Sequence, residues 1–549
     1  MQSEGESASS GSLPIVVQIG FAGLRHMLPT AAHPNANAME DIETLACTHL
    51  TKVLQSLPQD LKLSSHHFLC GLSQIAIGGD TVFSRACQSI GITQRILLPQ
   101  HREDYLNAVG SDNAADFTPA EQHVARALLA SPNIIEESVV SSASTRRERF
   151  EDVNLELMEQ SDLLICLTRV DATGKAGGTR DVLDRASLRG HPTLEMRLDV
   201  RGSAPTFENL WYNREKFHAP EVPKELRDAR IRRESSEPGH TSVAQYASAL
   251  KSYTSVQAKW RRKGFKAAAV VIIGTHLAAT VFAVIALKIH VEHSEGPLPP
   301  AAILMRWLLG IEIGLLLAGF GVHHFLHQTR SARIWALSRL LAEMARSVAA
   351  LAQVHTPLAY LFRLPFPASI RAVVRTINVL HLRSTMAARG QPWIPKRDAY
   401  VQQRLRNNGQ LNYYERSLTR AQSLQKYAQR SFIGCSLGAI VASGLKLYLA
   451  MHPVTLLVGN YELILAVLGA LAVVLPVAAV GAMSLAASFD LEARENTYSE
   501  TLESLKTLVL HLEQATTERE FTRLALAAEE RLLGETADWA GRRAYTGVS

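Results

Sequence analysis

The first two hundred residues alternate short apolar runs with amphipathic stretches. Leu13–Ile19, His67–Leu72 and Leu163–Leu167 are nearly continuous apolar runs, and each is followed by a glycine-containing loop. A helical pattern of apolar positions follows, as in Met39–Leu57. Continuous apolar runs are typical of parallel strands buried on both faces. The alternation therefore predicts an α/β domain with a doubly wound parallel sheet, in which the strand at Thr193–Leu198 is the last.

The pattern changes after residue 258, where four apolar stretches reach the length of a membrane span. A helix needs about 20 apolar residues to cross roughly 30 Å of hydrocarbon. The sequence therefore predicts an all-α membrane part with four spans and long helices outside the bilayer. The predicted spans are Ala267–Leu287, Ala301–Phe320, Phe432–Leu449 and Leu463–Ala487.

Basic residues predict the orientation of these spans. Lys and Arg cluster before the first and third spans and after the second and fourth, whereas the connectors Val291–Pro300 and His452–Asn460 contain none. By the positive-inside rule, both connectors face outward and both termini are cytoplasmic in a multi-pass membrane protein. The expected organisation is a disordered terminus at 1–12, an α/β domain at 13–200, a linker at 201–240, a two-span unit at 241–353, a helical connector at 354–414 and a second two-span unit at 415–549.

The two two-span units share sequence. At a shift of 161 residues, Arg333, Ser338 and Leu341 align with identical residues in the segment after the fourth span. This alignment favours an internal duplication, in which each unit has a pre-span helix, two spans and a long cytoplasmic helix. In the second unit, Leu502, Leu505, Val509 and Leu512 share one helix face. Helices of this kind pair with each other or with another subunit.

The amino-acid composition excludes several classes of protein. The 549 residues are 47% hydrophobic, which excludes a disordered chain, and the net charge is +6. Five scattered cysteines with no CxxC pair fit a reducing compartment better than a disulfide framework or a zinc site. The N-terminus does not have the pattern of a signal peptide. We expect no metal, no cofactor and no catalytic set, because no such cluster stands out.

Three glycine-containing loops are expected at the carboxyl ends of the strands, where ligands of such sheets bind. They are Gly20–Gly23, Gly71–Asp80 and Gly174–Thr179. Glycine allows backbone N–H groups to approach phosphate oxygens, and the N-terminus of the next helix adds partial positive charge. Tight strand-to-helix turns would also require glycine. The loops favour a phosphorylated ligand, although no GxxxxGK[ST] motif is present.

The segments IGFAGLR, GLSQIAIGGDTVFSRACQSIGI and SDLLICLTRVDATGKAGGTRDVLDRA resemble the SLOG family. This Rossmann-like superfamily also includes DprA-like proteins, cytokinin-activating LOG enzymes and the N-terminal domains of melastatin-type TRP channels. The resemblance implies a pocket for a nucleotide or nucleotide-derived signal. Its expected ligand-binding residues here are Gly20, Gly23, Arg25, Gly78, Asp80, Gly177, Gly178, Thr179 and Asp181.

The C-terminal half resembles the SLATT family of two-span effector modules, through its paired hairpins and the segment EERLLGETADW. The two resemblances together imply a homo-oligomeric membrane effector or ion channel of a bacterial anti-phage system, functionally linked to a nucleotidyltransferase. The alternative is a membrane-tethered nucleotide N-glycosidase of phosphoribohydrolase or NADase type. The catalytic PGGxGTxxE loop of LOG enzymes is incomplete here; Asp181 is a candidate to replace its acid, and Glu136 and Glu137 are candidates for a second carboxylate. A third possibility is a channel controlled by loss of a standing ligand.

Two ionisable residues lie near the middle of predicted spans, Glu312 in the second and His276 in the first. A carboxylate at that depth costs several kcal/mol unless it is paired, hydrated or protonated. The two residues are therefore either an interhelical pair that fixes packing or candidate pore-lining groups.

Overall fold

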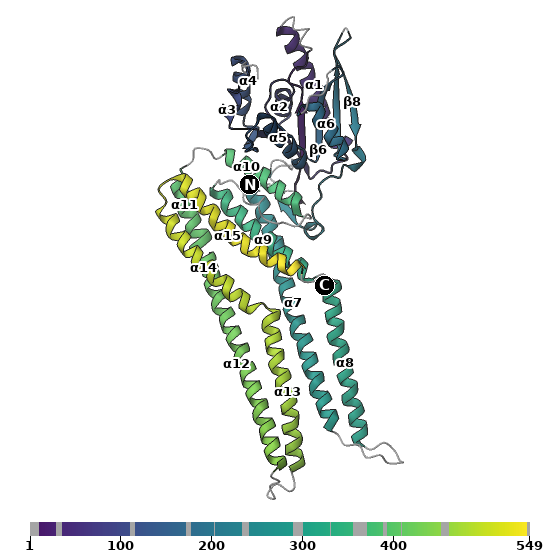
Figure 1. Ribbon diagram of the computed structural model, residues 1–549, viewed down its shortest axis with the longest axis vertical. Coiled ribbons are helices and arrows are strands. Elements are labelled where there is room, and N and C mark those ends of the chain that lie inside the picture. The colour runs from purple at the N-terminus through teal and green to yellow at the C-terminus, as the bar shows by residue number, and fades with distance from the viewer. Residues whose placement is uncertain are drawn as a thin grey trace, which may run out of the picture. The chain divides into compact units, whose positions relative to one another are not determined.

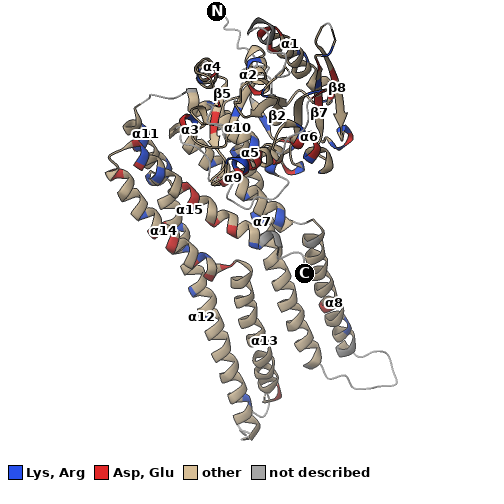
Figure 2. Ribbon diagram, turned by 45° about the horizontal axis from the view of Figure 1, so that its top comes forward, with Lys and Arg blue, Asp and Glu red and all other residues tan. Residues whose placement is uncertain are grey.

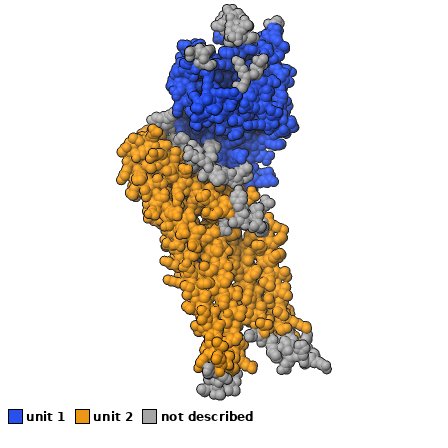
Figure 3. All heavy atoms as spheres, in the orientation of Figure 1, with its two compact units in different colours: residues 1–249, 355–361, 366–391 blue, residues 250–354, 362–365, 392–549 orange. Residues whose placement is uncertain are grey.

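The computed structural model describes residues 10–28, 36–109, 116–171, 177–202, 204–232, 241–288, 300–329, 331–354, 370–387, 392–407, 409–451 and 461–545. The chain forms two compact units (Figure 3). Unit 1 comprises residues 1–249, 355–361 and 366–391, and unit 2 comprises residues 250–354, 362–365 and 392–549.

Unit 1 contains a seven-stranded sheet in the order β5-β4-β3-β2-β6-β7-β8 (Figure 1). The first six strands in this order are parallel, whereas β8 runs antiparallel to β7. The prediction of a doubly wound parallel α/β fold is confirmed. The strands are β2 (Ile15–Gly23), β3 (His67–Ser73), β4 (Thr93–Leu98), β5 (Ile134–Val139), β6 (Leu163–Arg169), β7 (Thr193–Asp199) and β8 (Thr206–Tyr212).

Helices cover both faces of this sheet because its central strands are apolar on both faces. On one face, Val17, Ile19 and Phe21 of β2 pack in a core with α1 and α2. On the other face, Leu72 and Leu164 pack with α5 and α6. Thr118 caps α4 in a capping box with Glu121. The helices are α1 (Ala36–Asp60), α2 (Gly79–Ser89), α3 (Arg102–Leu106), α4 (Pro119–Leu129), α5 (Arg146–Gln160) and α6 (Thr179–Leu188).

Unit 1 also includes segments from the predicted terminus, linker and connector. β8 comes from the expected linker and makes the sheet one strand wider than predicted. From the same segment, β9 (Arg230–Arg232) pairs with β1 (Ser10–Ser12), which lies in the terminus we expected to be disordered. The expected connector contributes α10 (Arg371–Ala387), which contacts β2 and β5.

Specific contacts fasten α10 to the sheet. The backbone N–H of Val16 donates to Thr376 Oγ1 at 3.0 Å, and Arg375 forms an ion pair with Asp162 at 2.8 Å. Val379 packs against Val16 and other buried side chains. Burial raises the pKa of Asp162, and the Arg375 guanidinium opposes this rise. Unit 1 is therefore completed by residues more than 350 positions from its first strand.

Unit 2 is helical in its described residues, and the same sequence of helix lengths occurs twice. α7, α8 and α9 have 46, 29 and 24 residues, and α12, α13 and α14 have 42, 28 and 24. This agreement supports the predicted duplication. The helices are α7 (Val243–Lys288), α8 (Pro300–Gln328), α9 (Ser331–Val354), α11 (Trp393–Tyr400), the π-helix η7 (Val401–Arg406), α12 (Gln410–Met451), α13 (Tyr461–Ser488), α14 (Leu491–Gln514) and α15 (Glu518–Tyr545).

Four of these helices, α7, α8, α12 and α13, are long and apolar enough to cross a membrane. Their large apolar side chains are exposed, including Trp307, Ile440 and Leu463 at 69%, 67% and 63%. Figure 2 shows long uncharged stretches in α12 and α13. Side chains of this kind, exposed at this density, require an apolar surrounding such as lipid. Apart from Pro300, at which α8 begins, the predicted connectors lie outside the described residues.

The remaining helices of unit 2 pack around a buried polar network. Leu502, Leu505, Val509 and Leu512 of α14 are buried, which confirms the predicted apolar face. Glu529 of α15 is fully buried and accepts from Arg404 at 2.8 Å and from the Tyr400 hydroxyl at 2.9 Å. A buried carboxylate is tolerated only with such partners.

Candidate functional site

A pocket of about 300 Å³ lies at the carboxyl ends of β2, β3 and β6 in unit 1. Ligands of doubly wound sheets bind at this edge, and the volume is at the lower end of the roughly 300–1,000 Å³ typical of small-molecule sites. Its lining residues come from the loops after these strands, from α5 and α6, and from the segment before α4.

The loops after β2 and β3 touch each other directly. A Cβ on Gly23 would lie 2.6 Å from Gly79 Cα, so only glycine allows this approach. Gly78 has a φ of +93°, a region that favours glycine. The carboxylate of Asp80 accepts from the backbone N–H of Gly23 and of Ala76, both at 3.2 Å. The Asp80 carboxylate therefore holds the two loops together at the pocket.

Asp80 is 5% exposed, and burial raises its pKa to about 7. The two backbone N–H groups stabilise the carboxylate and oppose this rise. The Asp80 carboxyl therefore changes charge near neutral pH, next to the pocket.

The loop after β6 forms the second wall and leads into α6. Gly177 has a φ of +78°, and Gly178 is the N-cap of α6. The Thr179 hydroxyl donates to the Gly23 carbonyl at 2.8 Å, which joins this loop to the first one. The Asn154 side chain donates to the Gly177 carbonyl at 3.0 Å. The N-terminus of α6 is thus held at the pocket, where its free N–H groups favour an anion.

Three aromatic residues, here called the aromatic end of the pocket, also line it. Tyr105 and Phe117 are nearly fully buried and meet edge to face at 5.2 Å, and Phe150 lies 6.3 Å from Tyr105. The guanidinium of Arg25 lies over the Phe117 ring at 5.6 Å, and that of Arg146 over the Phe150 ring at 5.7 Å. Aromatic faces and flat guanidinium groups provide stacking surfaces for a planar ring such as a nucleobase.

All four arginines that line the pocket have carboxylate partners. Asp116 pairs with both Arg25 and Arg146, at 3.6 and 2.6 Å. Arg169 pairs with Asp171, and Arg180 pairs with the buried Glu195 at 3.2 Å. The pairs hold the guanidinium groups in place and bring the pocket close to neutrality.

Six of the nine predicted ligand-binding residues line the pocket: Gly23, Arg25, Asp80, Gly177, Gly178 and Thr179. Gly20, Gly78 and Asp181 are not among the lining residues. A Cβ on Gly20 would lie 2.8 Å from Ser161 Cβ, so Gly20 allows β2 to pack closely. Asp181 accepts from the Gly177 N–H at 2.8 Å and from Arg185. Burial raises the pKa of Asp181, but these two partners bring it below its ordinary value.

Sequence reasoning missed the aromatic end of the pocket. Tyr105, Phe117, Arg146 and Phe150 come from residues 101–150, outside the three glycine loops. A sequence signal for them is weak, because isolated aromatic residues in amphipathic segments more often belong to a core. Glu136 and Glu137 on β5 do not line the pocket. They pair with Arg95 and Arg102.

The two ionisable residues of the spans lie apart in unit 2. The His276 ring donates to the Ile272 carbonyl at 2.7 Å, and a Cβ on Gly319 would meet this ring at 3.0 Å. Gly319 is seven residues from Glu312, about two helical turns. No ion pair joins Glu312 to His276 among the residues described, so the interhelical pair is not formed in this structure.

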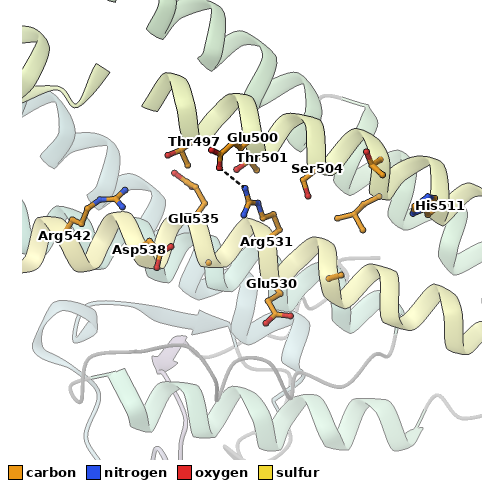
Figure 4. Close-up of a pocket in the computed structure, with 14 residues that line it drawn as sticks. Thr497, Glu500, Thr501, Ser504, His511, Glu530, Arg531, Glu535, Asp538 and Arg542 are labelled. Carbon is orange, nitrogen blue, oxygen red and sulfur yellow. Dashed lines mark ion pairs between the residues drawn. The ribbon is translucent and has the colours of Figure 1, made fainter. Parts of the chain in front are cut away.

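A second hollow, of about 820 Å³, lies between α14 and α15 in unit 2 (Figure 4). Both signs of charge line it, with Glu500 and Arg531 paired at 3.6 Å. Its other charged side chains include Glu530, Asp538 and Arg542. Acidic residues outnumber the two arginines in its lining, so the groove offers no site for an anionic ligand. Within the described residues, no group of three or more His, Cys, Asp or Glu side chains is placed to hold a metal ion.

Comparisons with protein-family models, curated proteins and solved structures find no match for this chain.

Proposed function

We propose that this protein is a membrane effector controlled by a nucleotide or nucleotide-derived signal that binds the pocket of unit 1. The observation that carries the proposal is the mixed lining of this pocket. The start of α6 and the side chains of Tyr105, Phe117 and Phe150 all line it. Backbone N–H groups at a helix start suit a phosphate, and aromatic groups suit a base.

The near-neutral charge of the pocket also limits the charge of the ligand that it favours. The four arginines are already paired, so a ligand with many phosphates would gain little additional attraction. The small volume and the paired charges favour a single nucleotide unit at the site, either alone or as one part of a larger signal.

The four apolar helices of unit 2 supply the effector part of the proposal. Basic residues before the first and third spans favour cytoplasmic termini at a bacterial inner membrane. Ligand binding changes the membrane part only if the signal binds two states of the chain with different affinity. The chain leaves unit 1 along α7, returns to it after α9 and leaves it again beyond α10, so at least three covalent connections are available to transmit a rearrangement of the sheet.

The resemblances to the SLOG and SLATT families extend this proposal to an anti-phage system. In it, a homo-oligomer opens an ion channel or otherwise perturbs the inner membrane, and a nucleotidyltransferase makes the signal. These parts rest on the family resemblance alone.

Ligand binding and ion flux by the purified full chain test the proposal. A panel of nucleotides, cyclic nucleotides and NAD-derived compounds would be screened by thermal shift and then by ion flux from liposomes. Gly178→Trp should fill the pocket and abolish both responses, because Gly178 lines the pocket at the N-cap of α6. Leu188→Trp is the matched control, since Leu188 is at the other end of α6 and is 89% exposed. Equal ligand binding by both variants would refute the assignment of the pocket.

One observation favours the alternative of an N-glycosidase. Asp80 lines the pocket, and its raised pKa is suited to a general acid near neutral pH. This reading predicts release of a base from NAD or from a nucleoside monophosphate by the purified protein, and loss of that release in Asp80→Asn. If the protein binds a nucleotide without cleaving it, the receptor proposal holds and the enzyme reading fails.

A further inference from the structure

Unit 2 contains a cavity of about 660 Å³ whose charge is strongly one-sided. It lies between α7, α9, η7 with the start of α12, and the start of α14, so both repeats contribute to it. Seven lysine and arginine residues line this basic cavity, against a single acidic residue, Glu343.

Three of the seven basic residues serve the structure of the cavity wall. Each is an arginine with a carboxylate partner, and Arg339 also lies over the Trp539 ring at 4.4 Å. Burial raises the pKa of Glu343, but Arg404 and Arg346 bring it below its ordinary value, so it remains charged and paired. The ion pairs are Arg404 with Glu529 at 2.8 Å, Arg339 with Glu535 at 3.5 Å and Arg346 with Glu343 at 2.6 Å.

Another three basic residues, Lys251, Lys259 and Arg262, lie on α7, and the seventh, Arg494, lies at the start of α14. At about 100° per residue, positions 251, 259 and 262 fall within an arc of roughly 80°, on one face of the helix. None of the three forms an ion pair with any residue that the structure describes. The wall formed by α7 therefore brings uncompensated positive charge to the cavity.

The position of these residues along α7 sets the depth of the cavity relative to the predicted span. Arg262, Lys259 and Lys251 are five, eight and sixteen residues before Ala267, where the apolar stretch begins. At 1.5 Å per residue these separations are roughly 7, 12 and 24 Å, and the long Lys259 side chain shortens the second. The headgroup layer on each side of the hydrocarbon is roughly 5–8 Å thick. If α7 crosses a bilayer, Arg262 lies at the depth of lipid phosphates.

We propose that the basic cavity binds the phosphate of an anionic phospholipid headgroup. Lys259 and Arg262 contact the phosphate, and the paired arginines keep the cavity open. The lipid then bridges the two repeats, because α7 and α9 belong to the first and α12 and α14 to the second. The inference requires that the four helices cross a membrane, but it is independent of the ligand of unit 1. Basic pockets beside membrane spans suit such headgroups.

The unmodified chain provides the first test. It would be reconstituted without nucleotide in phosphatidylcholine vesicles, with or without phosphatidylglycerol, and the lipid retained after extraction would be measured by native mass spectrometry. Phosphatidylglycerol should be enriched over phosphatidylcholine. Equal retention of the two lipids would overturn the proposal. A parallel titration with inorganic pyrophosphate in a zwitterionic detergent distinguishes the source of phosphate. If pyrophosphate binds at these residues and anionic lipid does not displace it, the lipid assignment is wrong.

Matched variants then locate the site. Lys259→Gln with Arg262→Gln removes two charges that line the cavity. Arg261→Gln with Lys263→Gln removes the same charge from the same turns of α7, at residues that do not line it. The first pair should lower retention of phosphatidylglycerol about 30-fold. The control pair should lower it much less. Equal losses of retention in both pairs would show general surface attraction and refute the site. The absence of a loss in either pair would also refute it. Helicity and elution volume of each variant check its fold.

Discussion

The pocket of unit 1 and the basic cavity of unit 2 hold positive charge in opposite ways. In the pocket, each of the four arginines has a carboxylate partner, and backbone N–H groups supply the anion-binding surface. In the basic cavity, the α7 face adds Lys251, Lys259 and Arg262 with no described partner. If each site binds the ligand proposed for it, the pocket selects its ligand by shape and the basic cavity selects its ligand by charge. Binding in the pocket should depend on close backbone packing, whereas binding in the cavity should depend on ionic strength.

The largest expected effect distinguishes the basic residues that stabilise unit 2 from those that are proposed to bind the lipid phosphate. Arg404→Met should lower the stability of unit 2 by about 3–5 kcal/mol, because Glu529 and Glu343 would lose a buried partner. Lys259→Met should leave stability nearly unchanged, because Lys259 is exposed. Chemical denaturation followed by helical circular dichroism measures both. Similar losses of stability in the two variants would show that the paired and unpaired basic residues do not differ in this way.

The pH dependence of unit 1 gives the next effect. Burial raises the pKa of Asp80 to about 7 in the folded chain, against about 3.9 in an unfolded one. The folded state therefore binds the proton more tightly, and stability falls as pH rises from about 4 to about 7. The decrease is at most about 4 kcal/mol. Thermal unfolding of unit 1 across this range should show it.

Asp80→Asn is the matched variant for this measurement. It should flatten the pH dependence, whatever its effect on stability at any one pH. An unchanged slope would contradict a role for Asp80.

A third prediction tests selection by shape. Gly23→Val should abolish ligand binding in the pocket and lower stability by about 1–3 kcal/mol, because the new side chain would force Gly79 away. Gly202→Ala is the control, since a Cβ there meets its nearest neighbour at an ordinary 3.6 Å. Thermal shift with the nucleotide identified by screening measures both effects. Ligand binding retained in Gly23→Val would show that close loop contact is not required.

The smallest expected effect compares the two regions directly. Raising the salt from 0.1 to 1 M shortens the screening length from about 10 to about 3 Å. Retention of anionic lipid at the basic cavity should fall, and nucleotide affinity at the pocket should change much less. Both are measured on the same preparation. A stronger salt dependence at the pocket would reverse the comparison.

The parts of the fold that follow from local pattern were predictable. Buried parallel strands and membrane-length helices both appear as continuous apolar runs, so β2, β6 and the four long helices follow from sequence. The sequence predicts Gly23, Gly177 and Gly178 as site residues because glycine is typical of tight turns and of helix starts. The nucleotide signal and the channel activity stay predictions.

The features that depend on distant contacts were not predictable. The aromatic end of the pocket forms only when α3, α5 and the segment before α4 pack together. The short strand β8 is an exposed edge of mixed residues from Thr206 to Tyr212, which resembles a polar linker. α10 gives no sign in its own sequence that it belongs to unit 1, because its partners lie in β2 and β5.

The insertion of α10 into unit 1 has a consequence for synthesis. The sheet receives the Thr376 contact and the Val379 packing only after the ribosome has made two of the four long apolar helices. At about 5–20 residues per second, the interval between residues 249 and 387 is roughly 7–28 s. During this time the nascent chain exposes Val16, Cys70 and Ile135, which α10 later covers. If α7 and α8 enter a membrane during synthesis, they therefore do so before unit 1 is complete.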